Sequence, residues 1–272
     1  MQNGVKHLTM TSKETIKISA VLITYNEEHN IERCLRSLLP VADEIVVVDS
    51  NSTDKTREIA ESLNAKVFIK DFTGFGEQKA YAISQTSNDW ILSIDADEVL
   101  SPELQNDLLE AKKGPSHNGY SFNILTNYCG KWIRHCGWYP QPKLRFLNKN
   151  KGQINSNPVH EGFVMNDSQE TVGAFNGDLL HYSYNSISDH NRKIQLYTEL
   201  SARSSVQKGR TVSLLKIIVA PRWIFLYHYI IRLGFLDGYW GYILCKNISY
   251  ESFIKYTKIR LYARARRLQA AM

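Results

Sequence analysis

The chain has 272 residues, 43% of them hydrophobic, so it can bury the core of one large domain or of one domain with an appendage. Its net charge of +6 is uneven, because Lys and Arg gather near residue 272, and a basic tail suits an anionic surface such as phospholipid or nucleic acid. Four cysteines without a CxxC pair argue against a zinc site or a disulfide framework and favour a reducing compartment.

The first residues show no targeting signal. Residues 1–16 are polar, lack the apolar core of a signal peptide, and are expected to be a disordered leader. No run approaches the roughly 20 apolar residues that a membrane-spanning helix needs. We therefore expect a cytoplasmic protein.

Short apolar strands alternate with helices over residues 17–118, the first predicted segment. The expected strands are 18–24, 44–49, 65–69 and 90–94, and the expected helices are 29–39, 56–63 and 78–85. This alternation predicts a mostly parallel sheet with right-handed crossovers, and continuous Val/Ile runs indicate strands covered on both faces. The predicted fold class is α/β, with a Rossmann-like mixed sheet flanked by helices.

The pattern changes near residue 119. The strand-like runs 120–124, 143–147, 159–164 and 179–182 predict that residues 119–190 form mixed sheet covering the first half. Residues 191–272 are predicted to be a helical, amphipathic and basic extension, with a helix at 190–208. Within it, residues 211–245 are apolar and aromatic but interrupted by charges and Pro221. They fit either a segment lying in a membrane interface or a helix pair packed on the core.

An acidic tip follows the fourth expected strand. Side chains alternate along a strand, so Asp95 and Asp97 share one side at its carboxyl end, where open α/β sheets bind ligands. Two clustered acids need a nearby cation, and Mg²⁺ or Mn²⁺ prefers such oxygen ligands and often bridges to phosphates. The tip therefore predicts a nucleotide or sugar-nucleotide site. The alternative is a pair of solvated turn residues.

Three segments, in this order, resemble the family 2 inverting glycosyltransferases with the GT-A fold: VLITYNEE at 21–28, EIVVVDSNSTDKT at 44–56 and IDADE at 94–98. A second similarity, to bacterial lipopolysaccharide-core β-glucosyltransferases, rests on FTGFGEQK at 72–79, VHE at 159–161 and GFLDG at 234–238. Together these imply a metal-dependent hexosyltransferase that uses a nucleoside-diphosphate sugar, with UDP-glucose the first guess. The implied acceptor is a glycolipid or a lipopolysaccharide core.

The resemblance also implies roles for the residues after the first two strands. Base and ribose would be held, and the surrounding loop lined, by Thr24, Tyr25, Asn26, Glu27, Asp49, Ser52 and Asp54. Tyr25 would stack on a pyrimidine, and Asp49 would accept a hydrogen bond from uracil or ribose. The alternatives are that Asn26 caps a helix and that Asp54 caps the helix near Thr56.

Two cations and the acidic tip complete the implied donor site. Lys79 would contact the diphosphate or the base, with a solvated helix lysine as the alternative. Arg145 would pair with phosphate through both arms of its guanidinium, with a structural ion pair as the alternative. Ala96 lies between the two acids of the tip. Asp97 is the implied metal ligand, and Asp95 contacts the ribose or, through water, the metal.

The remaining assignments concern the metal and the base. His181 is a candidate third metal ligand, with a hydrogen-bonded core histidine as the alternative. Inverting transfer needs a carboxylate that takes the proton of the acceptor hydroxyl. Glu161 is the preferred base, His160 would orient it or bind acceptor, and Glu98 is a rival.

Two other classes of function compete. A nucleotidyltransferase of related fold generally needs a glycine-rich basic loop after the first strand, whereas this chain has the acidic residues Glu27 and Glu28 there. A non-catalytic carbohydrate- or membrane-binding protein would not need both acids of the tip. The expected location is the inner face of the cytoplasmic membrane, as a peripheral protein, without a nucleic-acid partner.

Overall fold

The computed structural model describes residues 15–155 and 162–270. The expected leader, apart from residues 15–16, and the candidates His160 and Glu161 lie outside the described residues. The chain divides into two compact units. The first contains the residues up to Phe122 and Pro142–Leu179, and the second contains Asn123–Gln141 and the residues from Leu180 onward. The division at residues 118 and 190 stays a prediction.

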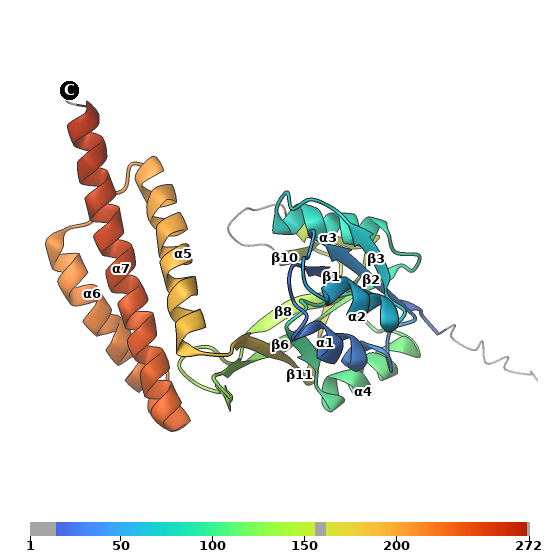
Figure 1. The fold of residues 1–272 in the computed structure, drawn as a ribbon. Coiled ribbons are helices and arrows are strands. Elements are labelled where there is room, and N and C mark those ends of the chain that lie inside the picture. The colour runs from blue at the N-terminus through green and yellow to red at the C-terminus, as the bar shows by residue number, and fades with distance from the viewer. Residues whose placement is uncertain (1–14, 156–161, 271–272) are drawn as a thin grey trace, which may run out of the picture. The chain divides into compact units, whose positions relative to one another are not determined.

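The first unit is built on parallel strands (Figure 1). The order in the main sheet is β3-β2-β1-β4-β8-β6-β11-β5. The first four strands are parallel and run over β1 Ile18–Thr24, β2 Glu44–Asp49, β3 Lys66–Ile69 and β4 Trp90–Ser93. Val and Ile side chains of β1, β2 and β4 form a buried core with Ala82 of α3, Phe75–Ser84. All four strands were predicted, and the α/β fold class is confirmed.

Helices connect these strands as expected. The helices α1 Ile31–Leu38, α2 Thr56–Ser62 and α3 all match predicted segments. Between β4 and residue 118, two elements were not predicted: β5 Glu98–Leu100 and α4 Pro102–Lys112. The start of α4 is nevertheless encoded locally, because the Ser101 hydroxyl accepts a hydrogen bond from Leu104 N and Pro102 occupies the first turn.

The other strands follow residue 118. They are β6 Gly119–Tyr128, β7 Lys131–Trp132, β8 Pro142–Asn148, β9 Gly152–Asn155, β10 Gly162–Met165 and β11 Val172–Tyr184. Strand β8 pairs antiparallel with β4, with Leu147 opposite Ile91. The expected runs 120–124, 143–147 and 179–182 are confirmed within longer strands. Of the expected run 159–164, the described residues 162–164 are in β10.

The second unit is mainly helical, as predicted. It contains α5 Ile187–Gln207, α6 Leu214–Leu226, a π-helical turn Tyr227–Ile231, a 3₁₀ turn Gly234–Asp237 and α7 Gly238–Ala270. A buried cluster joins the three helices through Ala202, Ile217 and Ile259. By length and composition alone, the helical stretch Leu214–Ile231 is able to cross a membrane. This differs from the expectation from sequence, because Lys216, Pro221 and Arg222 interrupt the apolar residues of this stretch.

Two glycines permit a close approach at the start of α7. A Cβ on Gly241 would lie 2.0 Å from the carbonyl oxygen of Gly234. A Cβ on Gly234 would lie 2.7 Å from Cys245 Sγ and 2.8 Å from the carbonyl oxygen of His228. Part of the GFLDG segment is therefore required by backbone packing within the second unit.

The carboxylate of Glu44 joins three segments at the amino-terminal end of β2. It accepts hydrogen bonds from Ser19 Oγ at 2.5 Å and Ser87 N at 2.8 Å, and it pairs with Lys66 Nζ at 2.6 Å. Burial raises the pKa of this carboxyl, but Lys66 and the hydrogen-bond donors outweigh burial and lower the pKa to about 2.

We expect Glu44→Gln to lower the free energy of unfolding by about 1–2 kcal/mol at neutral pH. The depressed pKa stabilises the fold above the ordinary value of 4.5, and this contribution is lost as the pH falls towards 2. In denaturant titrations, the free energies of unfolding of the wild type and of Glu44→Gln should therefore become equal in acid. The control is Glu61→Gln, at an exposed position of α2. Its free energy of unfolding should equal that of the wild type at every pH.

Candidate active site

The carboxyl ends of β1, β2 and β4 meet at one edge of the sheet. Thr24 at the end of β1 is in register with Asp49 at the end of β2, and the amide of Ile94 donates to the Val21 carbonyl at 3.1 Å. Asp95 follows Ile94 directly. The predicted convergence of Thr24, Asp49 and Asp95 on this edge is therefore present within the first unit.

The loops after β1 and β2 are joined by hydrogen bonds in both directions. Asn26 N donates to Ser52 Oγ at 2.9 Å, and Thr53 N donates to Asn26 Oδ1 at 2.8 Å. Further along, Glu28 N donates to Asp54 Oδ2 at 3.1 Å. Asn26 itself has a φ of 53°, a left-handed conformation that Asn tolerates better than most residues. These side chains hold the rim of the site in shape.

The helix-capping alternatives can now be compared with the geometry. Helix α1 is preceded by Asn30, and no side chain caps it. The side-chain oxygen of Asn26 accepts from Thr53 N instead, so Asn26 does not cap this helix. Asp54 does bond locally, since its Oδ1 accepts from Thr56 N at 3.0 Å. Glu27 N donates to Thr56 Oγ1 at 2.8 Å, so Thr56 links this turn to the other loop.

Buried oxygens at this edge lack a hydrogen-bond partner among the described residues. Asp49 is 0% exposed, and its Oδ1 accepts from Ser52 N at 2.8 Å. Among the described residues, neither Asp49 Oδ2 nor Thr24 Oγ1 has a hydrogen-bond partner. Such unsatisfied buried acceptors are unfavourable, so a ligand donor at this point would stabilise the site. Tyr25, next to Thr24, is 59% exposed and presents its ring to solvent.

Two cations from distant segments pair with Asp95. Lys79 Nζ on α3 lies 2.8 Å from Asp95 Oδ1, and Arg145 Nη2 on β8 lies 3.1 Å from Asp95 Oδ2. Each cation is 14% exposed, so Lys79 is not a solvated helix lysine. Burial would raise the pKa of Asp95, but Arg145 and Lys79 outweigh it and hold that pKa well below its ordinary value. The sequence placed all three residues in the site, and it offered an ion pair as the alternative role of Arg145, which the structure contains. The pairing of Lys79 with Asp95 was not predicted.

Glu98 is the buried last residue of the turn 95–98, which we call the acidic turn. It is 1% exposed, its Oε2 accepts from Asp95 N at 2.8 Å, and its Oε1 lies 3.4 Å from Arg145 Nη2. The Glu98 amide donates back to the Asp95 carbonyl at 2.9 Å. Sequence reasoning named Glu98 only as a rival base. The signal for its positioning role was its spacing, an acid three residues after Asp95.

Cys34 and Gln78 are further polar neighbours that sequence reasoning missed. Cys34 Sγ lies 3.6 Å from the Asp95 carbonyl, and burial, reinforced by the carboxylates of the acidic turn, raises the pKa of its thiol well above the ordinary value. Gln78, beside Lys79, is buried and donates to Ser50 Oγ at 2.9 Å and to the Lys70 carbonyl at 3.0 Å. Gln78 therefore fixes α3, and with it Lys79, to the loop after β2.

The donor set at the acidic turn fits a hard divalent ion only in part. The described residues contain no cluster of three His, Cys, Asp or Glu side chains placed to hold a metal. Asp97 and Asp95 supply carboxylate oxygens, but both Asp95 oxygens face cations. Substrate phosphates and water would have to complete the shell, as is common for Mg²⁺. His181 lies in β11, in the second unit.

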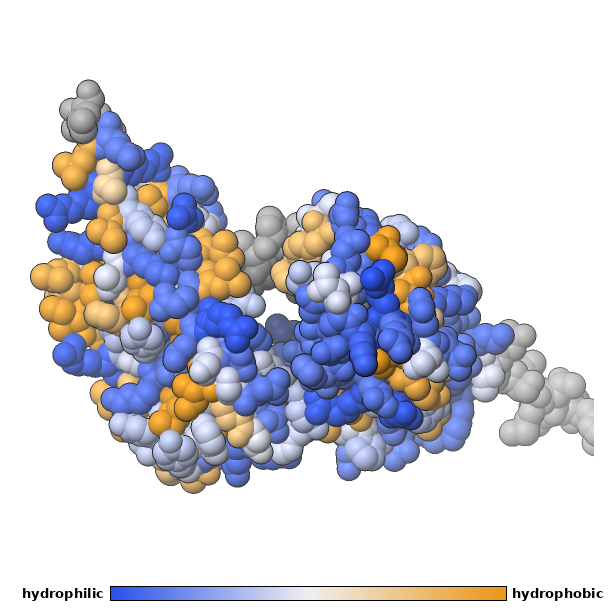
Figure 2. Space-filling model, viewed as in Figure 1, coloured by the Kyte–Doolittle hydropathy of each residue, from blue (hydrophilic) through white to orange (hydrophobic). Residues whose placement is uncertain are grey.

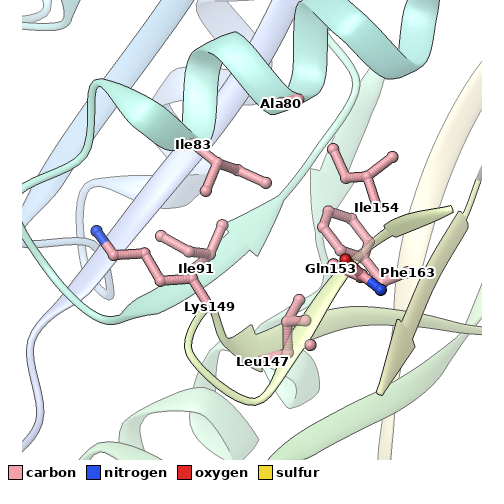
Figure 3. A pocket seen from close by; sticks show the side chains of 9 residues that line it. Ala80, Ile83, Ile91, Leu147, Lys149, Gln153, Ile154 and Phe163 are labelled. Atoms are coloured by element: carbon pink, nitrogen blue, oxygen red, sulfur yellow. The ribbon is translucent and has the colours of Figure 1, made fainter. Parts of the chain in front are cut away.

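A separate pocket of about 300 Å³ lies between α3 and the β9–β10 hairpin (Figure 3). Its lining is mainly apolar and includes Ile83, Ile91 and Phe163. None of the predicted site residues that the structure describes lines it. The pocket is thus distinct from the polar edge described above.

Residues 19–168 match the family model for glycosyl transferase family 2, so the chain belongs to this family of glycosyltransferases. A glycosyltransferase of Rickettsia bellii is 34% identical over 92% of this chain and 88% of its own length. The lipopolysaccharide core biosynthesis glycosyltransferase LpsC of Rhizobium meliloti is 30% identical over 90% of this chain and 92% of its own. The structure of S. aureus TarS 1-349 aligns over 92% of both chains, with 16% identity and a TM-score of 0.41.

Proposed function

We propose that this glycosyltransferase is metal-dependent and inverting, and that it moves a hexose from a nucleoside-diphosphate sugar to a glycolipid or lipopolysaccharide-core acceptor. UDP-glucose is the first donor to test. The observation that carries the donor site is the buried, unpartnered Asp49 Oδ2 on the same sheet edge as the acidic turn. The relative named for lipopolysaccharide core biosynthesis supports the acceptor class.

The donor would bind along the rim of the first unit. Asp49 Oδ2 accepts a hydrogen bond from the base or ribose, and the exposed ring of Tyr25 stacks on the base. Lys79 and Arg145 supply positive charge for the diphosphate, while Asp95 holds both cations in place before the donor arrives. The loops after β1 and β2, which Asn26, Ser52 and Asp54 join by hydrogen bonds, keep this rim preorganised.

A divalent ion, Mg²⁺ or Mn²⁺, would be held mainly by Asp97, with Asp95 contributing through water. When bound, the ion neutralises negative charge on the departing diphosphate. Asp95 is better suited to position the turn, because its oxygens are paired with cations.

The acceptor hydroxyl must lose a proton as it attacks the anomeric carbon in line with the departing diphosphate. Glu161 remains the proposed base and His160 the residue that orients it. Glu98 is a poor rival, since it is 1% exposed and accepts a hydrogen bond from Asp95 N. We place the enzyme at the inner face of the cytoplasmic membrane, where a glycolipid acceptor would be presented.

A thermal-shift panel tests the proposal directly. UDP, GDP and TDP sugars are each added with Mn²⁺ or Mg²⁺, and release of nucleoside diphosphate is followed in parallel. Stabilisation by UDP-glucose and metal-dependent release of UDP are expected. Pyrophosphate release from a nucleoside triphosphate would instead indicate a nucleotidyltransferase, and glycan binding without turnover would indicate a non-catalytic protein.

We expect Asp49→Asn to weaken UDP binding about tenfold or more, because the amide replaces the free acceptor oxygen with a donor. The bond from Ser52 N can be kept by the remaining carbonyl oxygen, so thermal stability should change little. Isothermal titration with UDP measures the effect. Unchanged affinity would place the nucleotide away from this edge.

A further inference from the structure

Helix α6 and the π-helical turn after it expose an apolar face. Six apolar side chains there are more than half exposed: Leu214, Leu215, Val219, Trp223, Ile230 and Ile231. We call these six residues the α6 surface. Ile217 and Pro221 are buried, so the helix packs on the second unit through a narrow stripe only. Figure 2 shows hydrophobic side chains gathered over α6.

Residues 200–250, which contain the α6 surface, carry mainly positive charge. Between residues 200 and 250 the sequence has seven Lys and Arg residues and one acidic residue, Asp237. Asp237 is 7% exposed and accepts a hydrogen bond from His135 N at 2.8 Å. The seven cations are all exposed: Arg203, Lys208, Arg210, Lys216, Arg222, Arg232 and Lys246. This stretch therefore presents apolar and cationic groups without an exposed carboxylate.

We propose that the α6 surface binds an anionic phospholipid bilayer. Exposed aliphatic and Trp side chains flanked by Lys and Arg match the composition of helices that lie in the membrane interface. Lys246 Nζ lies 4.6 Å from the Phe225 ring centroid, so its charged end remains near the apolar residues of α6.

The packing of α7 argues that α6 lies in the interface instead of spanning the bilayer. Ser249 Oγ on α7 donates to the Pro221 carbonyl at 2.7 Å, and Lys216 Nζ lies 5.0 Å from the Tyr256 ring centroid. The α7 segment that runs beside α6 also carries Glu251 and Lys255. Crossing the hydrocarbon with α6 would drag these charges into it, which is strongly unfavourable.

This inference deepens the proposed function, because a glycolipid acceptor would lie in the same bilayer. It does not depend on catalysis, however, since all residues of the α6 surface belong to the second unit and the donor edge belongs to the first. Vesicle binding and UDP binding can therefore be measured separately on one protein.

The test uses co-sedimentation with vesicles of phosphatidylcholine alone and of phosphatidylcholine with phosphatidylglycerol in equal parts. The wild type should bind the anionic vesicles more tightly. The triple variant Leu215→Gln, Trp223→Gln, Ile231→Gln should bind them about tenfold or more weakly. Arg222→Gln with Arg232→Gln should weaken binding about twenty-five-fold, because each cation near the surface contributes about fivefold.

Leu196→Gln with Leu200→Gln is the matched control, because both side chains are 56% exposed but lie on α5. This control should bind anionic vesicles like the wild type, and every variant should keep its UDP thermal shift. Quenching of Trp223 by shallow brominated lipids, compared with Trp223→Phe, should exceed quenching by lipids brominated at the bilayer centre.

Absence of wild-type binding to anionic vesicles, an equal loss in the control, or strongest quenching at the bilayer centre would overturn the proposal. If UDP binding fails while vesicle binding responds as expected, the proposed function falls and the lipid-binding surface stands. If vesicle binding fails while UDP binding is retained, the lipid-binding proposal falls and the proposed function stands.

Discussion

Asp97→Asn is expected to reduce hexose transfer by about a hundredfold or more. The substitution keeps the size of the side chain but removes the negative charge proposed to hold a divalent ion, and such an ion contributes several kcal/mol to stabilising the leaving group. Asp95 cannot substitute fully, because its two oxygens already face Lys79 and Arg145. Initial rates of UDP release, measured over a range of Mn²⁺ concentrations, should show both a lower turnover and a higher metal requirement.

Asp89→Asn is the matched control for this experiment. Asp89 is exposed and immediately precedes β4, whereas Asp97 follows the carboxyl end of the same strand. The control should retain full turnover and the wild-type metal requirement. If Asp97→Asn also retains them while Asp49→Asn loses UDP affinity, the nucleotide site stands and the metal assignment at the acidic turn is wrong.

The edge that carries this site was predictable because it depends on local patterns. Continuous apolar runs mark β1, β2 and β4 as buried parallel strands, and parallel strands bring their carboxyl ends together. A polar residue at each end, such as Asp49 or Asp95, must then lie near the others. The apolar runs and the acidic residues that follow them are enough to predict that these side chains lie together, without any knowledge of side-chain packing.

The partners of these residues were not predictable in the same way. Arg145 reaches Asp95 because β8 pairs antiparallel with β4, a long-range choice that no local pattern around Arg145 specifies. The bonds of Asn26 to Ser52 and Thr53 depend equally on two loops meeting. In contrast, the missed start of α4 was present in the sequence as Ser101 followed by Pro102.

Arg145→Ala is expected to lower the free energy of unfolding by about 3 kcal/mol at neutral pH, because it removes the cation that faces both Asp95 and the buried Glu98. Arg145 helps to hold the pKa of Asp95 below its ordinary value, so its stabilising effect is complete above 3.8 and is lost as the pH falls further. Denaturant titrations should therefore show a gap between wild type and variant that is widest at neutral pH and narrows in acid.

Lys143→Ala supplies the control, since Lys143 is exposed two residues earlier on the same strand and should leave stability unchanged. Arg145→Lys should recover part of the lost stability, because an ammonium restores the charge but cannot contact Asp95 and Glu98 with the planar geometry of the guanidinium. A gap that stays constant between neutral and acidic pH would mean that Lys79 alone keeps Asp95 ionised. In that case Arg145 would stabilise β8 by packing, and its charge would remain available for the diphosphate.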